Sequence, residues 1–190
     1  FLGFWVLRDL PTPGQLVTRD QQITTKIYDR NGVLLYKIYR NQNRTLVPLS
    51  EIPLYVRQAT IAIEDASFYS HSGVSIKGIV RALVRNTSRS ELAGGSTITQ
   101  QLVKNALLSP EKTISRKFKE ILLAVQVELA FSKDQILEMY LNEVGYGGAA
   151  YGIEEASQLY FGKPARGLTL AEGALIAGLP QAPTTYSPFG

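Results

Sequence analysis

The sequence predicts a mainly α-helical domain that carries one small β-hairpin near its N-terminus. Two observations lead to this prediction. From residue 50 onward, apolar residues recur at helical spacing in one segment after another, and several of these segments start with Ser or Thr, which cap helices. Before residue 50, two β-rich runs flank an Asn-Gly dipeptide, which supplies the positive φ angles of a tight hairpin turn.

The composition indicates a globular domain with an anionic partner. Hydrophobic residues make up 45% of the 190 residues, and the formal net charge is +4. The charge suits nucleic acid, an acidic membrane face or a phosphorylated substrate. The chain has no cysteine, which excludes disulfides, thiolate catalysis and zinc–sulfur sites.

The N-terminal stretch has two interpretations. Residues 1–7, FLGFWVL, fit the last turns of a transmembrane helix with Trp5 and Arg8 at the water interface, or a short core segment. Because the first residue is Phe rather than Met, we expect a piece of a longer chain. Residues 10–22 contain two prolines and a glycine and are interpreted as a linker.

The hairpin is expected from residues 23–28 and 33–39, and the first helix from a cap at Ser50 to about Glu64. Capping boxes are predicted at Ser132 with Gln135 and at Thr169 with Glu172. The further helices are expected at residues 75–85, 97–107, 113–131, 133–142, 149–161 and 170–179.

Glu64 and Asp65 lie at the end of an apolar helix. A carboxylate that emerges there into a site would have its pKa raised by desolvation, which suits a general base. The pair would equally solvate a helix terminus. His71 is the single histidine, and it lacks the partners of a metal site, so a structural hydrogen bond in a loop fits it better than catalysis.

Two further motifs suit phosphate chemistry. Gly94 to Thr97 precede a helix, where free backbone N–H groups bind anions, although a turn with a cap fits too. Gln100 and Lys104 are four residues apart and share a helix face, as do Arg116 and Glu120. The second pair fits either a solvated ion pair or a cationic cluster for a pyrophosphate.

The motifs, in the order in which they occur along the chain, resemble those of the peptidoglycan glycosyltransferases of glycosyltransferase family 51. This family forms the polymerase domain of class A penicillin-binding proteins and of monofunctional glycosyltransferases. The string GGSTITQQLVKN is the most specific match. Lys112 departs from the pattern, because relatives often carry Arg there. The strings that carry the resemblance are EDASF with His71 and Gly73, GGSTITQQLVKN at 94–105, RKFKE at 116–120, ILEMYLNEVGYG at 136–147 and AEGALIAGLPQAP at 171–183.

The resemblance implies a lysozyme-like helical fold with two lobes, in which residues 1–22 are the end of a membrane anchor and a linker and residues 23–190 form the glycosyltransferase domain. A transpeptidase domain could follow. The smaller lobe would face the membrane, at the extracytoplasmic side of the cell membrane. Its candidate apolar residues, for which ordinary core is the alternative, are Val74, Ile76, Ile79, Val80, Leu83 and Val84.

The resemblance also implies the reaction. Lipid II and a lipid-linked glycan would be the substrates, with β-1,4 linkage by inversion and release of polyprenyl pyrophosphate, and the phosphoglycolipid moenomycin would mimic the donor. Glu64 would be the base and Glu120 the second essential carboxylate. Mg²⁺ or Mn²⁺ could be required, with Glu120 as a possible ligand, and no organic cofactor is expected. The substrate-binding residues would be Asp65, Phe68, His71, Gly95, Ser96, Thr97, Gln100, Gln101, Lys104, Asn105, Lys112, Arg116 and Lys117.

Two alternatives are weighed against this function. A lysozyme-like hydrolase or lytic transglycosylase cuts neutral glycosidic bonds and does not need cations at its leaving-group site. A non-enzymatic basic module would bind membrane or nucleic acid, but the basic residues are not interleaved with stacking aromatics, so no nucleic-acid partner is expected. Cell-wall synthesis or division proteins are possible partners.

Overall fold

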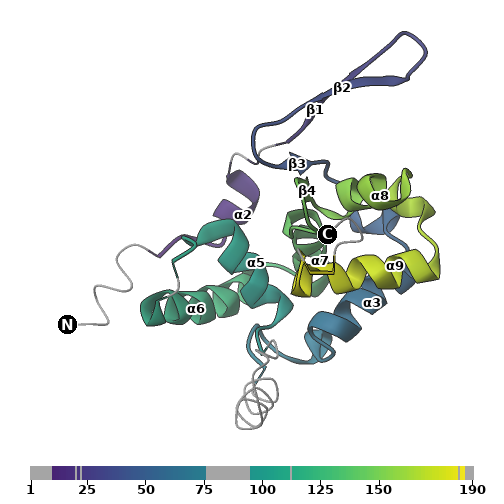
Figure 1. The fold of residues 1–190 in the computed structure, drawn as a ribbon. Helices are drawn as coiled ribbons and strands as arrows, with labels where there is room; N and C mark the ends of the chain where they lie inside the picture. The colour runs from purple at the N-terminus through teal and green to yellow at the C-terminus, as the bar shows by residue number, and fades with distance from the viewer. Residues whose placement is uncertain are drawn as a thin grey trace. The chain divides into compact units, whose positions relative to one another are not determined.

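The computed structural model describes residues 10–19, 21, 23–75, 95–111, 113–183 and 185–186. The chain divides into two compact units, one from Phe1–Arg19 and Thr60–Tyr140 and the other from Asp20–Ala59 and Leu141–Gly190. Helices dominate the order of elements, and the longest strands form one antiparallel hairpin (Figure 1), so the predicted mainly α class is confirmed. Within the described ranges, no helix has both the length and the apolar character needed to cross a bilayer.

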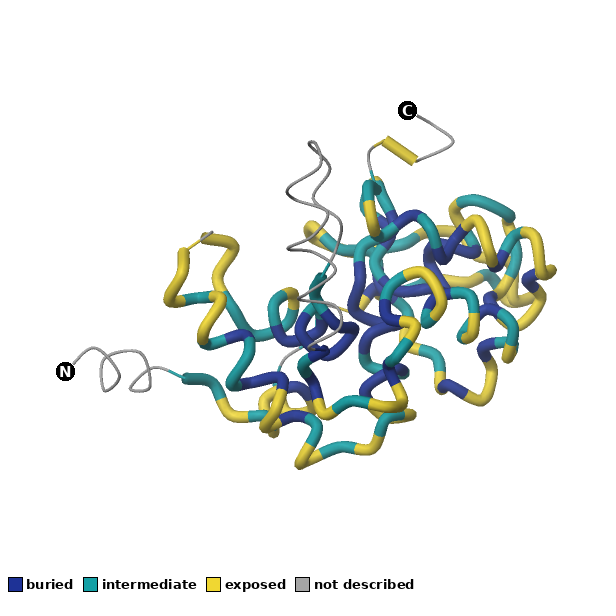
Figure 2. Tube along the Cα trace, turned by 90° about the horizontal axis from the view of Figure 1, so that it is seen from below, coloured by how far each residue is buried: buried dark blue, intermediate teal, exposed yellow. Residues whose placement is uncertain are grey.

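The first unit is built around two packed helices, α5 (Ile98–Leu107) and α6 (Ile114–Ala130). Threonine caps begin both, because Thr97 accepts from the Gln100 N–H and Thr113 from the Arg116 N–H. Figure 2 colours the buried positions of this unit dark blue. Its fully buried apolar side chains include Phe68, Ile98, Leu102, Val103, Leu123, Ala124, Val127, Ile136, Leu137 and Tyr140.

Residues 10–22, interpreted from the sequence as a linker, contain a short helix, α2 (Gln15–Thr18). This helix contacts α5. Leu16 is buried, and Arg19 Nη1 donates to the Ala106 carbonyl at 2.8 Å, near the C-terminal end of α5. Positive charge at that end complements the helix dipole. Within this stretch, Leu16 and Arg19 thus attach the chain to the first unit, while Val17 is exposed.

The second unit carries the hairpin of β1 (Thr25–Tyr28) and β2 (Leu34–Ile38), as predicted. Asp29 Oδ1 accepts from the Asn31 and Val33 N–H groups and closes the turn. A second, parallel pair joins β3 (Asn43–Arg44) to β4 (Ala150–Tyr151). Two α-helices of the described residues lie wholly within this unit, α8 (Ile153–Phe161) and α9 (Leu170–Gly178).

Two predicted helix starts are wrong. Instead of a helix from Ser50, the chain forms a 3₁₀ turn (Leu49–Glu51), and α3 (Leu54–Glu64) begins only after Pro53, because proline disfavours helical backbone at the residue before it. The helix expected from residue 149 begins at Ile153, since β4 occupies the preceding residues. Gly152 has φ +80°, and an added Cβ would lie 2.8 Å from the Asn142 carbonyl oxygen.

The other helices agree with the predictions within two residues, including α7 (Lys133–Glu143). Both capping boxes are confirmed, with Gln135 Oε1 2.8 Å from the Ser132 nitrogen and Glu172 Oε2 2.6 Å from the Thr169 nitrogen. The helix expected at residues 75–85 lies outside the described residues from residue 76 onward, as do residues 1–7.

Candidate active site

Glu64 is the last residue of α3, and its carboxylate is largely removed from water. Gln101 Nε2 on α5 donates to Glu64 Oε2 at 2.7 Å. Among the described residues, Glu64 Oε1 is buried without a hydrogen-bond partner. Burial raises the pKa of Glu64, although the Gln101 hydrogen bond and the charge of Lys104 oppose that shift. A desolvated carboxylate with one free oxygen is suited to accept a proton near neutral pH.

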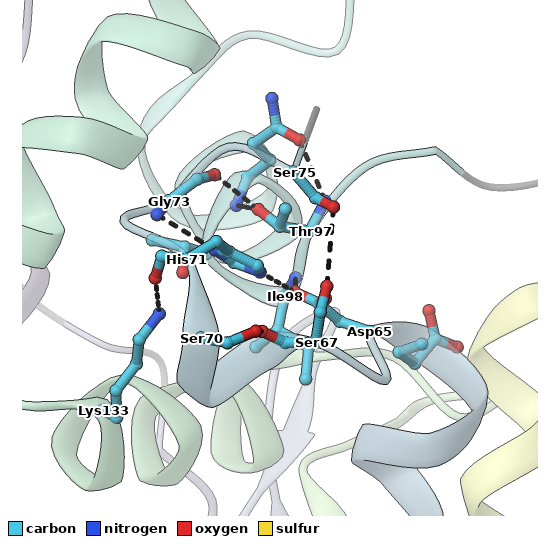
Figure 3. A network of polar contacts seen from close by, with 12 residues as sticks. Asp65, Ser67, Ser70, His71, Gly73, Ser75, Thr97, Ile98 and Lys133 are labelled. Carbon is cyan, nitrogen blue, oxygen red and sulfur yellow. Dashed lines mark hydrogen bonds and ion pairs between the residues drawn. The ribbon is translucent and has the colours of Figure 1, made fainter. Parts of the chain in front are cut away.

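Asp65 and His71 tie the loop after Glu64 to the start of α5 (Figure 3). Asp65 Oδ2 lies 2.8 Å from His71 Nε2 and accepts from the Ile98 N–H at 3.2 Å. The Gly73 N–H donates to His71 Nδ1 at 3.2 Å, which assigns the imidazole proton to Nε2. His71 therefore serves as a hydrogen-bonded bridge in the loop, and Asp65 as an acceptor for the N-terminus of α5.

Thr97 and Gln100 form a capping box that was not predicted as one. Gln100 Oε1 accepts from the Thr97 N–H at 2.9 Å, and Thr97 Oγ1 accepts from the Gln100 N–H and donates to the Gly73 carbonyl at 2.7 Å. Both side chains are buried. These contacts fix the direction in which α5 presents Gln101 and Lys104.

A cluster of charges lies where α5 and the start of α6 meet. Glu120 is buried and forms an ion pair with Lys117 Nζ, which also donates to Ser96 Oγ at 2.9 Å. Burial lowers the pKa of Lys104, and the charges of Glu120, Arg116 and Lys117 act on it as well. The cluster thus holds three cations and one buried carboxylate, which leaves net positive charge for an anionic ligand.

Arg116 carries a further sign of an anion site. Its Nη1 makes a long contact of 3.4 Å to the Pro110 carbonyl, and its buried Nε has no hydrogen-bond partner among the described residues. Buried donors are rarely left unpaired, and each costs about 1–3 kcal/mol. A phosphate oxygen would satisfy it.

The remaining predicted residues are placed less centrally. Phe68 is buried, Gly95 and Ser96 are half-buried, and Asn105 is exposed on α5. Lys112 lies outside the described residues. Sequence reasoning missed Glu128 and Lys133, which hold the loop after Glu64; no local motif marks them, because their contacts are distant in sequence.

Among the described residues, the donors around Glu120 do not fit a metal ion. The described part of the chain contains no group of three His, Asp or Glu side chains that could together hold one. The Glu120 carboxylate is already paired with Lys117, and its other charged neighbours are cations. Divalent cations prefer several oxygen ligands, which this cluster lacks.

Comparisons with known proteins identify the family of this chain. A family model described as Transglycosylase matches residues 31–190. Penicillin-binding protein 1F of Bacillus subtilis (strain 168) is 47% identical over 167 residues, which cover 87% of this chain and 23% of that protein. Penicillin-binding protein 1A of Neisseria lactamica is 46% identical over 181 residues, which cover 95% of this chain and 23% of that protein.

Among solved structures, penicillin-binding protein 1A from Haemophilus influenzae matches with a TM-score of 0.45 and 27% identity, over 90% of this chain and 16% of that one. The chain spans about a quarter of the length of the curated relatives named above. Because the family model covers most of its residues, the chain belongs to the transglycosylase family.

Proposed function

We propose that this chain is a peptidoglycan glycosyltransferase that polymerises lipid II into β-1,4 glycan strands. The observation that supports this most is the pairing of two features in one unit. Glu64 offers a desolvated carboxylate oxygen without a partner among the described residues, and Lys104, Arg116 and Lys117 form a cationic cluster that includes the buried Glu120. A base and a cationic leaving-group site are what this transfer requires.

In the proposed step, the 4-hydroxyl oxygen of lipid II attacks the anomeric carbon of the lipid-linked donor. Its proton passes to Glu64 Oε1, and the bond between the anomeric carbon and the phosphate oxygen breaks. Attack from the face opposite the leaving group inverts the α linkage to β. A positioned carboxylate base contributes about 10²–10⁴-fold to such a reaction.

The leaving group is polyprenyl pyrophosphate, whose negative charge grows as the bond breaks. Arg116 Nε and the ammonium groups of Lys104 and Lys117 would bind its oxygens, and charge-assisted hydrogen bonds of this kind are about twice as strong as neutral ones. Glu120 would orient Lys117 toward the phosphates. Neutralised pyrophosphate needs no proton to leave, so no general acid is assigned.

The alternative is a lysozyme-like hydrolase or lytic transglycosylase. The raised pKa of Glu64 would also suit a general acid, which such enzymes require. However, a neutral sugar leaving group gives no role to the cluster of Lys104, Arg116 and Lys117. The cations therefore favour transfer from a pyrophosphate donor.

We place the active chain at the extracytoplasmic face of the cell membrane, because its proposed substrates are anchored there by polyprenyl chains. The apolar residues suggested for membrane contact are Val74, which is half-buried, and others from Ile76 to Val84, which lie outside the described residues. Co-sedimentation with anionic liposomes tests this placement, and equal recovery in the supernatant with and without lipid would contradict it.

The function is tested by incubating the full-length protein with purified lipid II in detergent. Polymerisation predicts glycan strands that lysozyme degrades, with release of polyprenyl pyrophosphate, whereas a hydrolase would instead shorten preformed strands. Failure to consume lipid II together with cleavage of preformed glycan would reject the proposal in favour of the hydrolase.

A further inference from the structure

The loop that follows Glu64 rests on a lysine from another helix. Lys133, the first residue of α7, points its ammonium group at the His71 carbonyl, 2.6 Å away (Figure 3). The same nitrogen lies 4.5 Å from the centre of the buried Phe68 ring, within cation–π distance. Lys133 therefore contacts this loop at two points.

A buried carboxylate connects Lys133 to the helix that carries Gln101. Glu128 on α6 lies 2.7 Å from Lys133 Nζ through Oε2 and 2.8 Å through Oε1. Its Oε1 also accepts from Thr99 Oγ1 on α5 at 2.5 Å. The side chain of Glu128 is only 6% exposed, so its carboxylate oxygens depend on these donors for their hydrogen bonds.

The loop lies against α6 with no space to spare. Gly73 has φ +86°, and an added Cβ would lie 2.7 Å from the Ala124 carbonyl oxygen. The Thr97 hydroxyl also donates to the Gly73 carbonyl. A small shift of the loop away from α6 would therefore break the contact of Gly73 with α6 and its hydrogen bond to Thr97 at the start of α5.

We propose that Lys133 is a positioning residue that sets the place of Glu64 through the loop of residues 65–75. This inference rests on the proposed function, because it assigns Lys133 a part in the same proton transfer. From Lys133 the connection runs to His71, from the His71 ring to Asp65, and from Asp65 to the peptide bond it shares with Glu64.

The ammonium group is needed because it neutralises Glu128 and binds a carbonyl at once. Methionine would keep much of the apolar stem but leave Glu128 with the Thr99 hydroxyl as its one hydrogen-bond donor among the described residues, so the carboxylate would draw in water. The loop would then loosen, and Glu64 would become better hydrated. Arginine would keep the positive charge and the hydrogen-bond donors.

The test compares Lys133→Met with wild type in lipid II polymerisation by the full-length protein. We expect kcat to fall about 10- to 100-fold, because misplacing a reacting group by about 1 Å has effects of this size. KM should stay within about threefold of the wild-type value. Among the described residues, Lys133 contacts His71, Glu128 and Phe68, and the proposed phosphate-binding cations are not among these partners. Lys133→Arg should recover most of the lost kcat.

A pH profile separates positioning from a loss of stability. The charged groups that act on Glu64 are Lys104 on α5 and Asp65 in the loop. Hydration of Glu64 in Lys133→Met would lower its pKa toward the ordinary value, so the acidic limb of kcat should move to lower pH. The matched control is Lys163→Met, which removes another Lys–Glu pair, to Glu172 at 2.7 Å, in the other unit; its kcat and profile should stay as in wild type.

The outcomes are distinct. If wild type does not polymerise lipid II, the proposed function fails whatever Lys133 does. If wild type is active and Lys133→Met keeps its kcat and acidic limb, the positioning role is wrong. A drop in kcat that Lys163→Met shares equally, or that Lys133→Arg does not recover at all, would also overturn it.

Discussion

Gln101 Nε2 donates to one oxygen of Glu64 at 2.7 Å, and the other oxygen has no hydrogen-bond partner among the described residues. The Gln101 amide thus holds the carboxylate in place but leaves the second oxygen without a hydrogen bond from the described residues. The Tyr140 hydroxyl lies 3.3 Å from Gln101 Oε1 and steadies the amide in turn. This arrangement distinguishes the two oxygens of Glu64, because one is held by Gln101 and the other is buried without a partner among the described residues.

Glu64→Gln should abolish polymerisation, with a loss of about 10²–10⁴-fold or more, because the amide keeps the shape but cannot take a proton. The fold should persist. The pKa of Glu64 is raised by burial in the folded state, so the carboxylate costs stability at neutral pH and the neutral amide should leave the melting temperature unchanged or higher. Lipid II turnover and thermal melting measure both effects.

The control is Glu51→Gln, an exposed carboxylate in the 3₁₀ turn before α3. It should polymerise lipid II at the wild-type rate. Near wild-type turnover by Glu64→Gln would show that Glu64 is not the base.

Gln101→Leu should shift the pH dependence upward. The Gln101 hydrogen bond lowers the pKa of Glu64, so its loss should raise that pKa further. The base acts only when ionised, and the acidic limb of kcat/KM should therefore move to higher pH. Gln126→Leu, on an exposed position of α6, provides the control. An acidic limb that stays fixed, or moves to lower pH, would argue against Glu64 as the group that limits the rate there.

The sequence predicted several features that depend on near neighbours. The Asn-Gly turn and both capping boxes are set within four residues, and all of them appear in the structure. The pairing of β3 with β4 joins segments more than 100 residues apart, and no local pattern announces it. Pro53 was a local signal against a continuous helix from Ser50, and it prevailed over the apolar periodicity.

The candidate site was predicted as a set of residues rather than as a geometry. The motifs supplied Glu64, Gln101 and Lys104 but not which carboxylate oxygen is free. The capping contact of Gln100 was missed, although Thr97 and Gln100 have the same local spacing as the two boxes that were predicted. Lys133 was missed because its partners lie on the loop after Glu64 and on α6, and contacts between distant segments follow from packing.

Arg116→Ala and Lys104→Ala should each weaken the binding of moenomycin, which carries a phosphate like the proposed donor. A hydrogen bond to a charged group is worth about 1.5–3 kcal/mol, or about 10- to 150-fold in Kd. Arg166→Ala, at an exposed position of the other unit, should bind as wild type does. Binding is measured by fluorescence anisotropy with a labelled ligand, and unchanged affinity in both variants would remove the pyrophosphate site from this cluster.

Glu155→Gln should weaken the attachment of the hairpin to α8. Burial opposes ionisation of Glu155, but hydrogen bonds from Lys37, Thr45 and Lys26 outweigh it and lower its pKa from 4.5 to about 2. A lowered pKa gives stability that is present above about pH 4.5 and lost as the pH falls toward 2. We expect a loss of about 1.5–3 kcal/mol at pH 7.

Urea unfolding of Glu155→Gln at several pH values measures this loss, with Glu51→Gln as the control. The difference in unfolding free energy between wild type and Glu155→Gln should shrink as the pH falls below 4.5. A difference that is independent of pH would mean that packing around residue 155, rather than its charge, holds the hairpin.

Glu120→Gln addresses the least exposed carboxylate of the site. Its ion pair with Lys117 gives it an orienting role, because Lys117 also reaches Ser96 at the start of α5. Without the negative charge, Lys104, Arg116 and Lys117 would repel one another and lose their arrangement. Turnover should therefore fall severely, and moenomycin should bind more weakly.

The response to Mg²⁺ and Mn²⁺ decides between the roles open to Glu120. An orienting carboxylate predicts that the metal titration of the residual activity keeps its wild-type shape, since the described residues do not form a set of metal ligands around it. A changed metal requirement in Glu120→Gln, absent from Glu64→Gln, would make Glu120 a metal ligand. Wild-type metal dependence and wild-type moenomycin affinity, with only kcat lost, would instead place Glu120 against the donor sugar, because only the chemical step would then depend on its charge.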